Sequence, residues 1–193
     1  MRAAGHAPLL ASLLAAAIAL SGCVPAVIAV GAGSAAMVAA DPRTVGAQAD
    51  DEAIELKVAD QARTQYGDRI HINVTSYNGI VLLTGEVPDQ GAWASVGAIA
   101  KNTPKVRTVQ NEMVVAPTSE LGNRTNDTYI TSKVKARMVE ANKFPPNAVK
   151  VVTERGVVYL MGIVTRPQAD AAAEIAATTE GVVRVVKVFE YRA

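Results

Sequence analysis

Two stretches of this chain repeat the same succession of hydrophobic patterns. Apolar residues recur at four-residue spacing over 54–62 and again over 130–138. This spacing places the apolar side chains on one face of a helix, so each stretch predicts an amphipathic helix. Asp51 and Asp127 stand just before these runs, in the position of a helix N-cap.

A predicted hairpin follows each of these helices. Alternating apolar residues at 70–74 and 149–151 predict its first strand. The phrases NGIVLLTGEV at 78–87 and RGVVYLMGIV at 155–164 then supply a turn pair and an apolar second strand. Asn-Gly is a strong signal for a two-residue hairpin, because both central residues of a type I′ turn need positive φ, and Arg-Gly is a weaker equivalent.

Each copy ends with a second helix and a last strand. A proline stands near the start of each predicted helix, at 89–102 and 167–179. Closing strands are predicted at 105–115 and 182–191. The order α-β-β-α-β therefore occurs twice, and each copy is expected to form a three-stranded mixed sheet packed against two helices, an α+β fold.

The two copies align along their whole length. Residues 51–115 match 127–191 at an offset of 76, which becomes 77 after a one-residue insertion and then pairs Gly79 with Gly156. Agreement over a whole module favours duplication over chance.

The N-terminus resembles a bacterial lipoprotein signal. An uncharged apolar stretch from Pro8 leads to Leu20-Ser21-Gly22-Cys23, which is similar to the lipobox Leu-[Ala/Ser]-[Gly/Ala]-Cys. In such signals the cysteine thiol receives diacylglycerol, the peptide is cut before it, and the new amino group is acylated. Cys23 is the single cysteine, so it is the candidate lipidation site and no intramolecular disulfide can form. The alternative is a structural cysteine at the end of an ordinary signal peptide.

The residues after Cys23 indicate in which membrane the lipidated protein would be anchored. Two or more acyl chains anchor a protein stably, at about 0.8 kcal/mol per buried CH₂. Val24 occupies the place where the signal for inner-membrane retention has Asp, so we expect an outer-membrane anchor facing the periplasm. Residues 24–40 are apolar, but they contain Pro25 and are short for a span of about 20 residues. We expect them to lie near the lipid surface.

These observations predict five segments. They are a lipoprotein signal peptide at 1–22, a lipidated N-terminus and linker at 23–49, a first domain at 50–116, an interdomain linker at 117–125 and a second domain at 126–193.

The repeated unit resembles a known family. An apolar helix, the phrase Asn-Gly-x-Val-x-Leu-x-Gly-x-Val, an alanine-rich helix and a Val-rich closing strand are similar to the BON domain, a bacterial module linked to osmotic stress and membrane association. The duplication, the lipobox and the stretches DPRTVGAQADD at 41–51 and NDTYITSKVKARM at 126–138 resemble the dual-BON outer-membrane lipoproteins. The resemblance implies a protein that supports outer-membrane integrity and is enriched at division sites.

Charge is distributed unequally between the copies. The whole chain has 19 basic and 18 acidic residues, which gives no argument for nucleic acid. Residues 50–117 contain six basic and nine acidic residues, for a net charge of −3, whereas 124–193 contain eleven and seven, for +4. A basic domain beside an anionic bilayer is attracted by about 1 kcal/mol for each Lys or Arg near the surface.

The first helix of the second copy is the candidate binding site. A helical wheel places a core stripe at Ile130, Val134, Met138 and Ala141, with Arg137 at its edge. The opposite face carries the candidate phospholipid-binding residues Tyr129, Ser132, Ala136 and Val139, bordered by Lys133 and Lys135. Tyrosine suits a lipid interface because its ring is apolar and its hydroxyl polar.

The corresponding helix of the first copy is acidic, with Ala53, Leu56, Asp60 and Arg63 outward. On residue pattern alone, scattered exposed apolar side chains and solvated lysines remain an alternative to lipid contact. The resemblance implies binding of anionic phospholipids, such as phosphatidylglycerol and cardiolipin, through the helix of the second copy. Tyr129 stands where the family leads us to expect tryptophan.

Catalytic motifs are lacking in the sequence. His71 is the one histidine after the signal peptide, and it lies in a predicted strand without a nucleophile motif. No metal motif or phosphate loop is present, so we expect no enzyme, no metal and no cofactor. The acids at 50–52 are explained as a helix start. The alternative function is a periplasmic adaptor, in which the acidic first domain binds the outer-membrane β-barrel assembly machinery or a cell-wall remodelling factor. A hydrolase using His71 is a third, weaker hypothesis.

Overall fold

The structure, a computed structural model, describes residues 41–118 and 121–192. The predicted signal peptide, Cys23 and residues 24–40 lie outside the described residues. Val38–Ala193 form one compact unit. A fragment that begins at residue 41 therefore keeps every described residue and every hydrophobic cluster given below. Among the described helices, none has the length and apolar character needed to cross a membrane.

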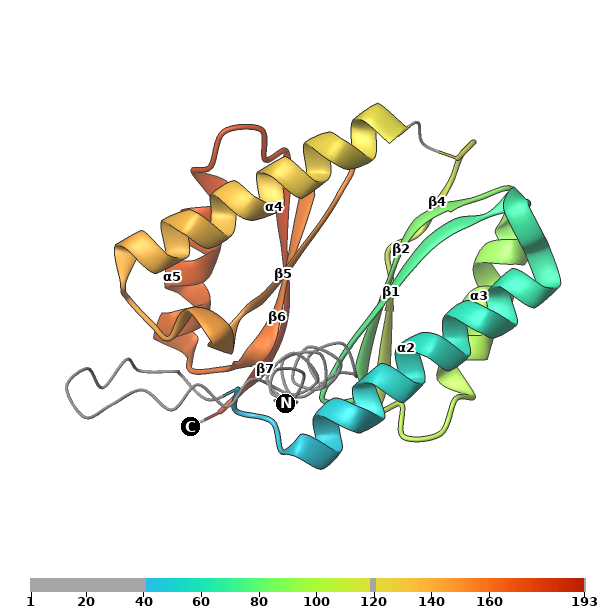
Figure 1. Cartoon of the computed structure of the whole chain (residues 1–193), viewed down its shortest axis with the longest axis horizontal. Coiled ribbons are helices and arrows are strands. Elements are labelled where there is room, and N and C mark those ends of the chain that lie inside the picture. Colours follow the sequence, from blue (N-terminus) through green and yellow to red (C-terminus); the bar gives the residue numbers. More distant parts are fainter. Residues whose placement is uncertain (1–40, 119–120, 193) are drawn as a thin grey trace, which may run out of the picture. The chain divides into compact units, whose positions relative to one another are not determined.

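The first repeat has the predicted order of elements (Figure 1). They are α2 Val45–Tyr66, β1 His71–Tyr77, β2 Ile80–Val87, α3 Gln90–Lys101, β3 Thr108–Asn111 and β4 Val114–Val115, with a 3-10 turn at Gly67–Arg69. Strand β1 pairs antiparallel with β2, and β3 and β4 pair parallel with β2 on its other edge.

The closing strand of this repeat is broken, although a single strand at 105–115 was predicted. Between β3 and β4 the side chain of Met113 turns into the core, and its carbonyl accepts a hydrogen bond from Trp93 Nε1 at 3.0 Å. The residues that make this inward turn leave the regular ladder, as in a β-bulge.

The second repeat follows the same order. Its elements are α4 Leu121–Ala141, β5 Lys150–Glu154, β6 Val157–Val164, α5 Arg166–Ala177 and β7 Arg184–Tyr191, with a 3-10 turn at Pro146–Ala148. Strand β6 is antiparallel to β5 and parallel to the unbroken β7. Helix α4 begins inside the segment expected to be the interdomain linker.

The predicted N-caps are wrong. Helix α2 begins at Val45 behind Thr44, whose hydroxyl accepts a hydrogen bond from Ala47 N at 3.1 Å, and α4 begins at Leu121. Asp51 and Asp127 therefore lie inside the helices, where both are buried.

These two aspartates instead bind the hairpin turns. Asp127 accepts hydrogen bonds from the backbone N–H groups of Arg155 and Gly156, both at 2.8 Å. Asp51 accepts the equivalent pair from Asn78 and Gly79 at 2.7 and 2.8 Å. The φ angles of the four turn residues lie between 51° and 73°, as a type I′ turn requires. Each first helix is thus fastened to the hairpin beside it.

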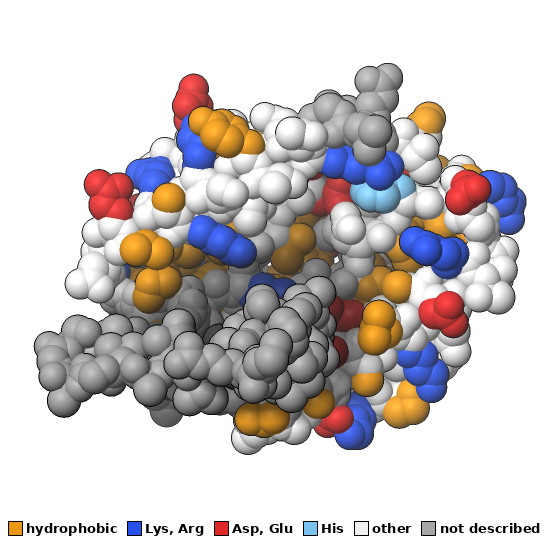
Figure 2. Space-filling view, viewed as in Figure 1, with side chains coloured by type: hydrophobic (Ala, Val, Ile, Leu, Met, Phe, Trp, Pro, Cys, Tyr) orange, Lys and Arg blue, Asp and Glu red, His pale blue; other side chains and the backbone are white. Residues whose placement is uncertain are grey.

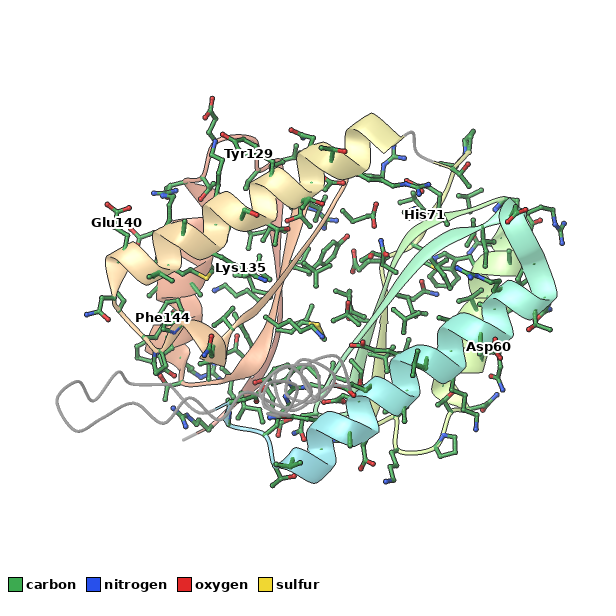
Figure 3. The ribbon with its side chains drawn as sticks, in the orientation of Figure 1. Asp60, His71, Tyr129, Lys135, Glu140 and Phe144 are labelled. Atoms are coloured by element: carbon green, nitrogen blue, oxygen red, sulfur yellow. The ribbon has the colours of Figure 1, made fainter. Side chains whose placement is uncertain are left out.

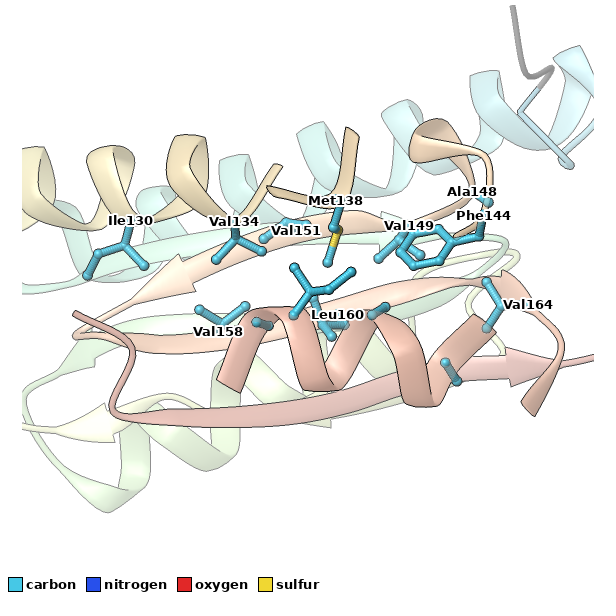
Figure 4. Packing of buried hydrophobic residues seen from close by; sticks show 14 residues of the cluster. Ile130, Val134, Met138, Phe144, Ala148, Val149, Val151, Val158, Leu160 and Val164 are labelled. Atoms are coloured by element: carbon cyan, nitrogen blue, oxygen red, sulfur yellow. The ribbon is translucent and has the colours of Figure 1, made fainter. Parts of the chain in front are cut away.

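Each repeat has its own hydrophobic core between its sheet and its two helices. In the second repeat, Ile130, Val134 and Met138 point from α4 toward the sheet residue Leu160 (Figure 4). The predicted core position Ala141 is exposed, because α4 ends there and the chain turns at Asn142, with φ 47°. Phe144 fills the corresponding end of the core.

The other faces of the two sheets pack against each other. A third hydrophobic cluster joins side chains from both repeats, Tyr77, Leu82, Tyr159 and Met161. Ion pairs cross the same boundary, between Arg107 and Glu190 at 2.8 Å and between Lys150 and Glu55 at 3.1 Å. Each sheet is therefore covered on both faces, by its own helices and by the other sheet.

Candidate functional site

The outward side of α4 holds the six residues predicted from the helical wheel. This α4 outer face consists of Tyr129, Ser132, Lys133, Lys135, Ala136 and Val139. The core stripe on the opposite side leaves these side chains away from the β-sheet. Tyr129 is 62% exposed and Val139 58% exposed, so both present apolar surface to solvent. Figure 3 shows Tyr129 and Lys135 leaving opposite edges of this face.

The two lysines differ in their surroundings. Lys133 Nζ lies 2.7 Å from Glu180 Oε2 and 5.3 Å from the centre of the Tyr129 ring. This contact lowers the pKa of Glu180 below its ordinary value, through the hydrogen bond from Lys133. Lys135 is exposed, and no carboxylate of the described residues lies within ion-pair distance of it. Lys135 therefore offers the less compensated positive charge.

The remaining two positions are small. Ser132 Oγ donates to the carbonyl of Thr128 at 3.0 Å, which turns the hydroxyl back onto the helix. Ala136 is exposed between the larger side chains. The face is therefore flat at its centre, with an aromatic ring at one end and a valine at the other. Figure 2 shows hydrophobic and basic side chains side by side on the surface over α4.

A groove of about 540 Å³ borders this face. Lys135, Met138 and Val139 of α4 form one wall. Residues that the helical wheel did not identify form the rest, among them Arg43, Tyr77, Pro146, Val149 and Lys150. The groove thus has apolar walls and three basic side chains, and it continues the α4 outer face inward.

Arg43 is held rigidly at the groove. Its Nη2 lies 2.6 Å from Asp41 Oδ2, its Nη1 lies 2.8 Å from Asp51 Oδ2, and its guanidinium carbon lies 4.1 Å from the centre of the Tyr77 ring. The hydrogen bond from Arg43 holds the pKa of Asp41 below its ordinary value. Burial raises the pKa of Tyr77 to about 12, and the negative charge of Asp41 adds to the effect. The Arg43 charge is therefore largely compensated, so Lys135 is the main source of positive potential here.

A second polar group lies between the sheets. His71 Nδ1 of β1 lies 3.0 Å from Glu86 Oε2 of β2, and Glu154 of β5 accepts a hydrogen bond from Asn73 Nδ2 at 2.7 Å. Burial raises the pKa of Glu154 above its ordinary value, against the hydrogen bond from Asn73. A cavity of about 400 Å³ adjoins His71 and Glu154. Sequence reasoning missed this group because its members lie far apart in the chain.

The sequence profile of the BON domain matches residues 50–117 and 126–193, which together make up more than half of the chain. The chain belongs to the BON-domain family. The resemblance inferred from the duplicated pattern is confirmed, as are the two repeats and their α+β fold.

Known proteins of this family align along much of the chain. Outer membrane lipoprotein DolP of Haemophilus influenzae is 45% identical over 94% of this chain and 95% of its own length. The 21 kDa hemolysin of Actinobacillus pleuropneumoniae is 37% identical over 78% of this chain and 79% of its own. Osmotically-inducible protein Y of Escherichia coli is 33% identical over 72% of this chain and 71% of its own length.

The similarity to DolP supports the predicted location, so the chain is a lipid-anchored outer-membrane lipoprotein with two BON domains. None of these three relatives carries the name of an enzyme.

Proposed function

We propose that this outer-membrane lipoprotein binds anionic phospholipids, such as phosphatidylglycerol and cardiolipin, through the α4 outer face, and that this binding supports outer-membrane integrity at division sites. The observation that carries the proposal is an exposed aromatic ring and an exposed valine on one helix face, bordered by lysines. The face belongs to the repeat with a net charge of +4, whereas the matching helix of the repeat with a net charge of −3 exposes Leu56 together with Asp60.

The magnitudes favour shallow, reversible binding. Burying a valine completely stabilises by about 1.5–3 kcal/mol, so Val139, already partly covered, can contribute roughly 1 kcal/mol. The Tyr129 ring supplies a similar apolar contact, with its hydroxyl left in the headgroup region. Lys135 adds about 1 kcal/mol beside an anionic surface. A sum of roughly 3 kcal/mol is weak alone, but the acyl anchor predicted at Cys23 would keep the face at the membrane.

Vesicle binding of the fragment 41–193 tests the proposal, because this fragment lacks the anchor. We expect binding to phosphatidylglycerol vesicles that weakens with added salt and is absent with phosphatidylcholine alone. Tyr129→Ala and Lys135→Glu should each weaken it five- to tenfold. Lys133→Glu should have a smaller effect than Lys135→Glu, because Glu180 already compensates Lys133.

Matched controls come from the first repeat. Leu56→Ala removes an exposed apolar side chain from α2, and Lys57→Glu reverses a charge at the position equivalent to Lys133. Neither change should alter vesicle binding. The proposal would be contradicted if vesicle binding did not change with salt or with either α4 substitution. It would also be contradicted if the α2 controls weakened binding as much as the α4 substitutions do.

A second candidate function is the protein adaptor. Val45 and Leu56 are large apolar side chains exposed on α2, on the acidic repeat. Such side chains suit docking of a protein such as the outer-membrane β-barrel assembly machinery or a cell-wall remodelling factor. This candidate predicts that Leu56→Ala, and not Tyr129→Ala, fails to restore detergent resistance to cells that lack the protein.

A further inference from the structure

Three side chains able to bind a metal meet between the two sheets. His71, Glu86 and Glu154 each offer one ligand atom, and these atoms all lie within 4.8 Å of one another. Two of the residues belong to the first repeat and one to the second. Figure 3 shows His71 at this boundary.

Both carboxylates are buried. Glu86 is 0% exposed and Glu154 is 6% exposed, so this group differs from the solvated acidic clusters common on protein surfaces. A carboxylate removed from water is costly unless a cation or hydrogen-bond donors compensate it. Asn73 and Thr84, which donate to Glu154 at 2.7 and 3.4 Å, are neutral and both contact Oε2.

Arg155 and His71 contact different oxygens of Glu86. Arg155 Nη1 lies 3.3 Å from Glu86 Oε1, whereas His71 Nδ1 lies 3.0 Å from Oε2. A metal bound by His71 and Glu86 Oε2 would therefore replace the contact between these two residues, and the contact with Arg155 could remain. Arg124 also lines the adjoining cavity, and its positive charge opposes a cation there.

The group does not come from the repeated scaffold. The backbone carbonyl of His71 approaches Gly85 in the first repeat as that of Ala148 approaches Gly162 in the second, so His71 corresponds to Ala148. By the same alignment, Glu86 corresponds to Ile163 and Glu154 to Tyr77. In the other repeat, therefore, each of the three equivalent positions holds a residue that is unable to bind a metal or poorly suited to it.

We infer that His71, Glu86 and Glu154 form a site for a divalent transition metal, with zinc as the expected ion, that ties the two BON domains together. Zinc binds both imidazole nitrogen and carboxylate oxygen, and with three protein ligands the fourth position would take water from the adjoining cavity. Zinc–ligand bonds of about 2.0–2.2 Å require ligand atoms about 3.4 Å apart, so a separation as wide as 4.8 Å must close by about 1.4 Å. The imidazole disfavours calcium and magnesium, which prefer oxygen ligands.

Zinc titration of the fragment 41–193, made without a histidine tag, tests this inference. His71 is the one histidine in this fragment, so an imidazole signal in the NMR spectrum is assigned without substitution. We expect calorimetry to show one zinc ion per chain, the His71 ring signals to shift, and the thermal midpoint to rise with zinc but not with magnesium. His71→Gln and Glu154→Gln should each weaken zinc binding at least tenfold.

Glu190→Gln is the matched control. It removes a carboxylate that also crosses between the repeats, where Glu190 pairs with Arg107, but it leaves the three ligands intact. Its zinc affinity should equal that of the unsubstituted fragment. Absence of zinc binding, or binding that leaves the His71 signals unmoved, would overturn the inference, and the group would then be an ion-pair network only. The NMR result decides this even if the substituted fragments fold poorly.

Discussion

Removing the Asp127 carboxylate should destabilise the second repeat through its hairpin turn. Asp127 is buried in α4 and accepts the backbone N–H groups of Arg155 and Gly156, both at 2.8 Å. Arg155 adopts a φ of 53°, which is uncommon for a residue with a side chain. In Asp127→Ala, both N–H groups lose their acceptor, and the turn loses its tie to α4.

The expected loss follows from the burial of the two bonds. A hydrogen bond to a charged group contributes about 1.5–3 kcal/mol. The bond from Gly156 is buried and should be lost in full, whereas water can partly replace the bond from Arg155, which is only partly buried. We therefore expect the free energy of unfolding to fall by about 3 kcal/mol, or roughly 6–12 °C in Tm for a chain of this size. This loss is a large share of the total free energy of unfolding of a domain, which is about 5–15 kcal/mol.

Urea unfolding of the fragment 41–193, followed by circular dichroism, measures this loss. Asp60→Ala is the control, because Asp60 is an exposed aspartate on α2 (Figure 3), and it should change stability by no more than about 0.5 kcal/mol. Asp127→Asn should be intermediate, since the amide oxygen can accept only one of the two bonds in the same geometry. If Asp127→Ala costs no more than Asp60→Ala, the carboxylate does not hold the turn.

Three further predictions concern acid stability, a glycine and the membrane anchor. Burial raises the pKa of Asp51, but its hydrogen-bond donors outweigh burial and hold that pKa below the ordinary value. The stability that the Asp51 carboxylate contributes is therefore complete above about pH 4 and is lost as the pH falls through the folded pKa. The free energy of unfolding should fall more steeply with decreasing pH for the unsubstituted chain than for Asp51→Asn. Gly85 has a φ of 108°, and an added Cβ would lie 2.1 Å from the carbonyl oxygen of His71. Gly85→Ala should therefore lower Tm sharply, whereas Gly46→Ala in α2 should not. Equal Tm values for the two variants would contradict this reasoning. Tyr129→Trp should strengthen binding to phosphatidylglycerol vesicles several-fold, because the larger ring buries more apolar area, and unchanged binding would argue against insertion of this side chain.

The hydrophobic pattern was enough to predict the order of elements in each repeat, although not the break between β3 and β4. The four-residue spacing around Val134 and the Asn78-Gly79 turn are local signals, since helix faces and type I′ turns depend on neighbouring residues. Both are present in the structure where expected. The helix starts were wrong because an aspartate before an apolar run suits an N-cap and a buried turn acceptor equally well. Only the packing of helix on hairpin distinguishes the two roles.

Contacts between the repeats were beyond the local pattern. Strands β2 and β6 have nearly continuous apolar runs, which indicate burial on both faces, but not what covers the second face. The meeting of Leu82 with Tyr159 depends on how the sheets pack. The same holds for the groove at Arg43 and for the cluster that includes Glu154. The α4 outer face could be predicted because all six of its residues lie on one helix.

The packing of sheet against sheet has a consequence for how the copies diverged. If a single repeat assembled as a symmetric homodimer, every substitution would occur on both sides of the contact. Two copies joined in one gene can change independently, and the covalent link keeps them at high effective concentration while they do. His71 and Glu86 on one side can then face Glu154 on the other, an asymmetric arrangement that gene duplication and fusion make available to a fold built from two copies of one module.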